Sequence, residues 1–119
     1  MLVKILKSKL HRARVTDAKL HYAGSIAIDS ALMAEVGLLP YESVIVANLN
    51  NGSRLETYVV PAEAGSGEVV ILGAAAQLVK AKDIVIIFSF AFMSAEEAVD
   101  FTPKVVALDE NNNIVKRIS

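Results

Sequence analysis

The chain has 119 residues, of which 54% are hydrophobic, and its 12 basic and 13 acidic residues leave a formal charge of −1. This length predicts a single domain, residues 1–119, and the balanced charge gives no reason to expect a nucleic acid or a membrane as partner. Because cysteine is absent, disulfides, thiol nucleophiles and cysteine-bound zinc are excluded, and two histidines are a poor basis for a metal site.

The first part of the chain predicts strands and one short helix. Residues 1–16 place apolar side chains at near-alternating positions, enough for one or two strands. In the stretch IDSALMAEVGLLP, Asp29 or Ser30 can cap a helix, Gly37 can end it, and Pro40 prevents its continuation.

A hairpin follows the helix. Residues 43–50 and 54–60 are rich in β-branched and aromatic side chains and flank Asn51-Gly52, a strong hairpin signal. The two-residue period of a strand predicts two opposite faces, with Arg54, Glu56 and Tyr58 on one and Leu55, Thr57 and Val59 on the other.

The second half continues the pattern of short strands. Residues 68–72 predict a strand, 73–79 a helical turn, and 83–93 a central strand buried on both faces. Residues 94–101 begin with a capping-box pattern typical of a short helix, and 104–118 predict a closing hairpin. We therefore expect a mainly β protein, a small barrel with a few short helices.

Two global features bear on location and assembly. The longest apolar run, 84–93, is too short to cross a bilayer as a helix, and basic residues interrupt the first fifteen positions, which predicts a cytoplasmic protein. The apolar composition exceeds what a small monomer usually buries, which favours a homo-oligomer.

One of the three Gly–Ser pairs has an unusual setting. The pairs at 52–53 and 65–66 lie among turn residues, where glycine and serine are ordinary. The pair Gly24–Ser25 lies instead in the strand-like run HYAGSIAID, where a glycine usually marks a bulge or a close backbone approach.

The hairpin offers a second candidate site. Arg54 and Tyr58 could together bind a carboxylate, because the guanidinium fork of arginine matches the two carboxylate oxygens, or they could simply form a solvated face of the hairpin.

Several stretches together carry a family resemblance: KSKLHRARVTDAKLHYAGSIAID, NGSRLETYVV, GAAAQLV, DIVII and a late EEA. In this joint pattern the chain resembles the pyruvoyl-dependent aspartate 1-decarboxylases (aspartate α-decarboxylases) over nearly its whole length. The resemblance implies a double-psi β-barrel and a cytoplasmic homotetramer with active sites between neighbouring subunits. It implies decarboxylation of L-aspartate to β-alanine and CO₂, which supplies pantothenate and coenzyme A synthesis.

The resemblance also implies the cofactor. Ser25 would attack Gly24, and self-cleavage into residues 1–24 and 25–119 would leave a pyruvoyl group at Ser25. Substrate would form a Schiff base with this group, which serves as the electron sink. Such a sink suits a chain without a Gly-rich phosphate loop for pyridoxal phosphate.

Site residues follow from the resemblance by position. Ser25 is the catalytic residue and Tyr58 the proton donor, since a phenol carries its proton at neutral pH. Gly24, Ser25 and Thr57 take part in processing. The expected substrate-binding residues are Lys9, Tyr22, Arg54, Thr57, Gly73, Ala74 and Ala75, and no metal is expected.

One position departs from the family pattern. Leu72 stands immediately before GAAA, where the family usually has asparagine. The loss of this amide leaves a second hypothesis open, a non-catalytic or poorly processed double-psi barrel that serves as a binding module. A third hypothesis is the decarboxylation of another small acidic amino acid. The retained Ser25, Thr57, Tyr58 and Arg54 favour the enzyme.

Overall fold

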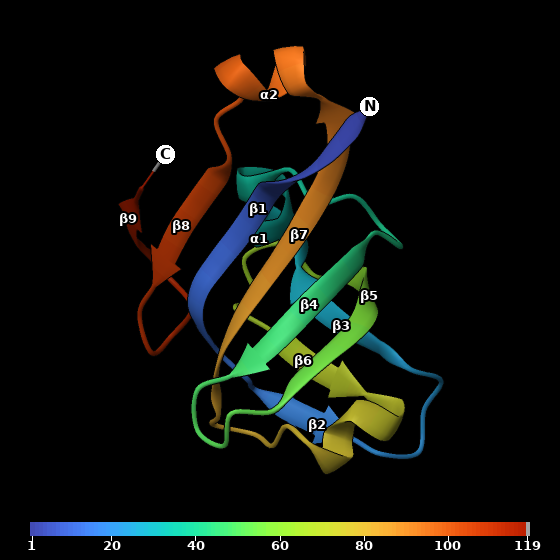
Figure 1. Cartoon of the computed structure of the whole chain (residues 1–119). Coiled ribbons are helices and arrows are strands. Elements are labelled where there is room, and N and C mark those ends of the chain that lie inside the picture. The colour runs from blue at the N-terminus through green and yellow to red at the C-terminus, as the bar shows by residue number, and fades with distance from the viewer. Residues whose placement is uncertain (119) are drawn as a thin grey trace.

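The computed structural model describes residues 1–118, which form mainly strands (Figure 1). The strands are β1 (Leu2–Arg14), β2 (Asp17–Lys19), β3 (Ser25–Asp29), β4 (Ser43–Asn48), β5 (Arg54–Ala62), β6 (Val69–Leu72), β7 (Ile84–Ser94), β8 (Lys104–Leu108) and β9 (Ile114–Arg117). The helices are α1 (Ser30–Val36), the 3₁₀ turn η1 (Gly73–Gln77) and α2 (Ala95–Asp100). In Figure 1, α2 lies at one end of the molecule and β2 at the other.

The strands pair in the order β2-β6-β3-β5-β4-β7-β1-β8-β9. Three of these pairs are parallel, β1 with β8, β2 with β6 and β3 with β5, and each joins segments that are distant in the sequence. β3 is therefore held on both sides, by β5 in parallel and by β6 in antiparallel orientation.

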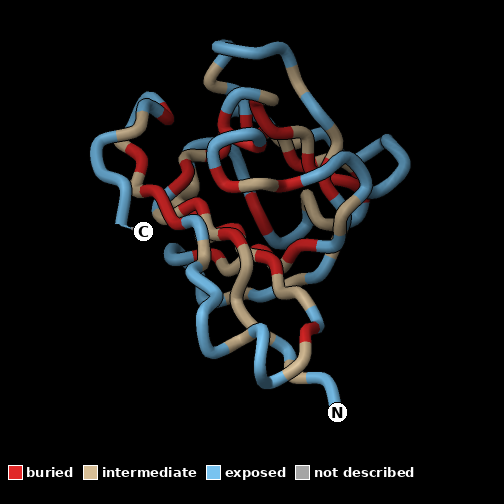
Figure 2. Tube along the Cα trace, turned by 90° about the horizontal axis from the view of Figure 1, so that it is seen from above, coloured by how far each residue is buried: buried red, intermediate tan, exposed pale blue. Residues whose placement is uncertain are grey.

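The buried apolar side chains form one cluster inside the strands, where Figure 2 shows the buried segments. Complete burial of each large aliphatic side chain stabilises the fold by about 1.5–3 kcal/mol. The largest fully buried side chains include Leu10, Ile26, Ile28, Ile71 and Ile87.

The predicted helix signals are confirmed. The carboxylate of Asp29 accepts from the amide of Ala31 at the start of α1, and Gly37 ends the helix with a left-handed φ of 73°. At α2, Ser94 and Glu97 form the reciprocal capping box that the sequence predicts. The β4–β5 and β8–β9 hairpins also lie where the sequence places them.

Two local predictions differ from the structure. The strand β7 is central, between β4 and β1, but only one of its faces is buried, because Phe88, Phe90 and Phe92 point to the other face and Phe92 is 69% exposed. Gly24 lies in a bend just before β3 rather than inside a strand.

Within residues 1–118, no helix has the length and apolar character needed to cross a bilayer.

Candidate functional site

Ser25 occupies a fixed and buried position. It is the first residue of β3, it is 5% exposed, and it pairs with Leu72 across the antiparallel ladder to β6. Gly24 precedes it in an exposed bend that leads from β2. The Gly24–Ser25 bond therefore joins an exposed surface bend to a strand that is paired on both sides.

The backbone of Gly73 lies directly against Gly24. Gly73 opens η1 with a left-handed φ of 84°. A Cβ at Gly73 would lie 2.8 Å from the Cα of Gly24, 2.8 Å from the carbonyl oxygen of Tyr22 and 2.9 Å from the nitrogen of Gly24. Only glycine allows two backbones to approach this closely. The sequence left a bulge and a close backbone approach open at Gly24; the structure has the close approach, and Gly73 is the residue that permits it.

A hollow of about 300 Å³ opens beside this contact. Its wall brings together four of the residues that the sequence predicts, Gly24, Thr57, Ala74 and Ala75, and it also includes Leu72. Thr57 thus lines the same hollow as Gly24, the residue on the N-terminal side of the Gly24–Ser25 bond. Ser25, the third residue of the predicted processing site, is not part of this wall.

The hollow has three further wall residues that the sequence argument did not single out, Leu55, Glu56 and Leu78. Leu55 shares a strand face with Thr57, so the period-two pattern carried a signal for it. Leu78 follows η1 and carried no such signal. The carboxylate of Glu56 accepts a hydrogen bond from the Ser43 hydroxyl at 3.0 Å.

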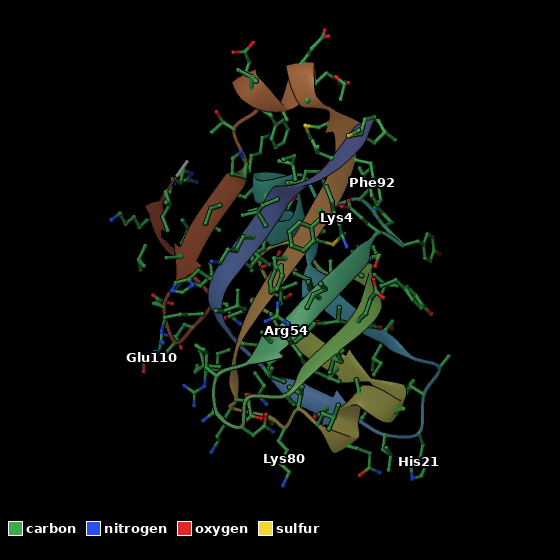
Figure 3. All side chains as sticks on the ribbon, in the orientation of Figure 1. Lys4, His21, Arg54, Lys80, Phe92 and Glu110 are labelled. Atoms are coloured by element: carbon green, nitrogen blue, oxygen red, sulfur yellow. The ribbon has the colours of Figure 1, made fainter. Side chains whose placement is uncertain are left out.

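Arg54 and Lys9 line a different hollow, also of about 300 Å³, on the outer face of β7. The Arg54 guanidinium lies 5.3 Å from the ring centroid of Phe88, within the range of a cation–π contact. Figure 3 shows Arg54 at the middle of the molecule, whereas His21, on the bend that leads to β3, lies at its lower end. No wall residue is common to the two hollows.

The two predicted tyrosines lie outside both hollows. Tyr58 is 39% exposed, and its ring lies 6.3 Å from that of Tyr41. Tyr22 is 59% exposed, and the ammonium of Lys19 lies 5.7 Å from its ring centroid. Both phenols are therefore open to a partner or a ligand.

The alternation of β5 explains this separation. Arg54, Glu56 and Tyr58 are exposed, whereas Leu55 and Thr57 are half-buried, as the predicted two faces require. Thr57 lines the hollow with Gly24 and Arg54 lines the other hollow, although Glu56, which shares the face of Arg54, also borders the hollow of Thr57. The predicted residues do not meet in one cavity of a single chain.

Two titratable groups near these residues have shifted pKa values. Burial lowers the pKa of His11, and the positive charges of Lys9 and Arg12 lower it further. The buried Nδ1 of His11 has no hydrogen-bond partner among residues 1–118. His11 does not line the outer hollow, whose positively charged wall residues are Lys9 and Arg54.

Asp29 is the last residue of β3, and its surroundings stabilise its charged form. Burial alone raises the pKa of its carboxyl group, but the amides of Gly67, Gly65 and Ala31 donate to the carboxylate and bring the net pKa below its usual value. This charged group ties the end of β3 to the loop before β6.

A comparison of structures supports the expected fold class. The crystal structure of a rationally designed protein, mkDPBB_sym_86, superposes with a TM-score of 0.50 and 25% identity and covers 69% of this chain and 90% of the design. The fold is mainly β, a double-psi β-barrel with a few short helices, as the sequence predicts.

Comparisons of sequence reach further. The aspartate 1-decarboxylase of Caldicellulosiruptor saccharolyticus is 52% identical over 116 residues, 98% of this chain and 91% of that protein. The enzyme of the same name from Bacillus licheniformis is 54% identical over 110 residues, 92% of this chain and 87% of that protein. The aspartate decarboxylase family model matches residues 1–115. The chain therefore belongs to the aspartate decarboxylase family.

Proposed function

We propose that this protein decarboxylates L-aspartate to β-alanine and CO₂, after self-cleavage at Gly24–Ser25, and so supplies pantothenate and coenzyme A synthesis in the cytoplasm. The observation that carries the proposal is the setting of Ser25. It is the first residue of β3, and the preceding residue, Gly24, lines a hollow together with Thr57. Membership of the family supports aspartate as the substrate.

Self-cleavage uses groups that the chain itself supplies. The Ser25 Oγ attacks the carbonyl carbon of Gly24, the C–N bond breaks, and the hydroxyl proton passes to the released amine, so that an ester replaces the amide. Loss of the Ser25 Cα proton then breaks the Cβ–Oγ bond and releases Gly24 as a carboxylate. The resulting enamine takes up water, loses ammonia and becomes a ketone. The products are residues 1–24 and 25–119.

Thr57 is the residue we assign to assist this step. Thr57 and Gly24 line one hollow, and in this proposal the Thr57 hydroxyl donates to the Gly24 carbonyl oxygen as negative charge develops there.

The surroundings of Ser25 fit a pyruvoyl group. This group contains only carbon and oxygen atoms placed where the serine already is, so it requires no cradle beyond the space that the 5% exposed Ser25 fills. The adjoining hollow, with Ala74 and Ala75 in its wall, leaves room for a small amino acid. The ketone, when present, supplies the electron sink for the loss of CO₂.

The remaining residues would bind substrate and move a proton. Arg54 and Lys9 would hold substrate carboxylates, since a guanidinium fork and an ammonium both pair with carboxylate oxygens. Tyr22 and the backbone of Gly73, Ala74 and Ala75 are the other residues that we propose to contact the substrate. Tyr58 would donate a proton to the carbon that has lost CO₂.

We further propose that the working form is a homotetramer in which neighbouring subunits complete each site. Thr57 and Arg54 face opposite sides of β5, so one chain alone does not present both to one substrate. The outer face of β7 supports the proposal as well, because Phe92 is 69% exposed and Phe88 and Phe90 are only half-buried. Burying such a face is what favours association.

One observation favours the second candidate, a poorly processed or non-catalytic binding module. Leu72 pairs with Ser25 and lines the hollow, so an apolar side chain stands where the family pattern usually has an amide. We rank this candidate below the enzyme because Ser25, Thr57 and Tyr58 are all present.

The intact mass of the purified protein distinguishes the two candidates. We expect two chains, 1–24 and 25–119, with the larger one reactive toward a hydrazide probe for ketones. The Ser25→Ala variant, which lacks the nucleophile, should remain one uncut and inactive chain. A wild-type protein that stays uncut after prolonged warming, with no carbonyl reactivity, would replace the enzyme by the binding module.

A further inference from the structure

The contact between Gly73 and Gly24 constrains the bond that is proposed to break. A Cβ at Gly73 would meet only backbone atoms, the Cα and nitrogen of Gly24 and the carbonyl oxygen of Tyr22, at 2.8–2.9 Å. Ordinary carbon contacts lie near 3.5–4.0 Å, so the segment would have to move by roughly 0.7–1 Å. Backbone atoms cannot rotate away as the end of a side chain can.

The neighbouring pairing leaves little freedom for such a move. Leu72, the residue before Gly73, is locked opposite Ser25 by the β3–β6 ladder. The two glycines in contact are the chain neighbours of this pair, Gly24 before Ser25 and Gly73 after Leu72. The pairing of β3 with β6 therefore fixes the position of both. A displacement at Gly73 would pass directly to the carbonyl carbon of Gly24.

The two glycines of this contact have different requirements. Gly24 does not have a left-handed φ, and a Cβ added to it would meet no atom within 4 Å beyond its chain neighbours. Gly73 has a φ of 84°, and a Cβ added to it would collide with three backbone atoms. The residue at which packing demands a glycine is thus Gly73, which lies far from the cleaved bond in sequence.

We propose that Gly73 is a positioning residue for self-cleavage, whose missing Cβ sets the place of the Gly24 carbonyl carbon relative to the Ser25 hydroxyl. The inference rests on the proposed self-processing at Ser25 and extends it to the residue that holds the reacting groups together. Attack requires the reacting atoms at about 3–3.5 Å, and a misplacement of about 1 Å costs about 10²-fold in rate.

Gly65 provides a matched control. Its φ is 82°, close to that of Gly73, but a Cβ there would meet no atom within 4 Å. Alanine at either position carries the same left-handed backbone penalty, and only alanine at 73 adds the collision with Gly24. A second pair of variants uses asparagine, which accepts left-handed φ more readily than other residues and so favours a folded protein.

The experiment follows self-cleavage by intact mass at a fixed temperature and thermal unfolding by circular dichroism. It uses the wild type and the variants Gly73→Ala, Gly73→Asn, Gly65→Ala and Gly65→Asn. We expect the Gly65 variants to cut at the wild-type rate and folded Gly73 variants to cut about 10–100-fold more slowly. The unfolding midpoint of Gly73→Ala should lie below that of Gly65→Ala, because only the former adds the collision, so cleavage rates are compared at a temperature at which every variant is folded.

Three outcomes would overturn the inference. Folded Gly73 variants that cut as fast as their Gly65 counterparts would show that the contact does not position the bond. If both Gly73 variants fail to fold while both Gly65 variants fold, Gly73 is a folding residue and not a positioning residue. If the wild type itself stays uncut, the proposed function fails and this inference fails with it, whereas the first two outcomes leave self-processing intact.

Discussion

Ser25 and Leu72 are direct partners in the antiparallel pairing of β3 with β6. Side chains that are opposite each other in such a pair lie on the same face of the sheet, so Leu72 is the cross-strand neighbour of the proposed nucleophile. Leu72 also lines the hollow beside Gly24. The position at which this chain departs from its family pattern is therefore in contact with the proposed chemistry.

We expect Leu72→Asn to speed self-cleavage by about 2- to 10-fold, the effect of one net hydrogen bond of about 0.5–1.5 kcal/mol. The introduced amide can donate to a carbonyl oxygen in the hollow, which leucine cannot. Time courses of intact mass would measure the change. Leu78→Asn, in the wall of the same hollow but away from Ser25, serves as control. An unchanged or slower rate in Leu72→Asn would contradict the prediction.

Arg54→Lys should lower kcat/KM for aspartate by about 10- to 100-fold, since hydrogen bonds to charged groups are worth about 1.5–3 kcal/mol and an ammonium cannot reproduce the fork. Cleavage at Ser25 should remain intact. Lys4→Gln is the control, because Lys4 does not line the hollow that Arg54 and Lys9 share and its ammonium lies 5.1 Å from the ring centroid of Phe90. Near-normal kinetics in Arg54→Lys would remove Arg54 from the substrate site.

Tyr58→Phe keeps the ring and deletes the proposed proton donor. We expect a processed chain with normal assembly and a loss in kcat of roughly 10²–10⁴-fold, the usual range for general-acid catalysis. Tyr41→Phe removes a hydroxyl from the ring that lies 6.3 Å away and should leave kcat unchanged. If Tyr58→Phe decarboxylates aspartate at the wild-type rate, another group donates the proton.

Asp29 makes stability depend on pH in a defined direction. Its pKa is lowered in the folded protein, so the stability it contributes is present above the unfolded value of 3.8 and is lost as the pH falls through the folded value. We expect Asp29→Asn to reduce the free energy of unfolding at pH 7 by about 1.5–3 kcal/mol and the difference to vanish at low pH. Urea unfolding at both pH values would test this, with exposed Asp17→Asn as control. A difference that persists at low pH would argue against the charge.

The sequence alone predicted the local elements because their signals are local. The helix α1 begins at Asp29 and ends at Gly37, and the Ser94 capping box begins α2, since capping depends on groups within a few residues. The alternation of β5 followed from its two-residue period. The motif around Gly24–Ser25 indicated the family, and the comparisons confirm it.

The tertiary structure decided which residues meet. The pairing of Ser25 with Leu72, the parallel pairing of β3 with β5 and the contact of Gly73 with Gly24 join segments distant in sequence. Local propensity does not set such registers; they depend on which faces the whole core buries. For the same reason, period-two alternation predicted that Thr57 and Arg54 face apart, but only the packed strands placed them in separate hollows.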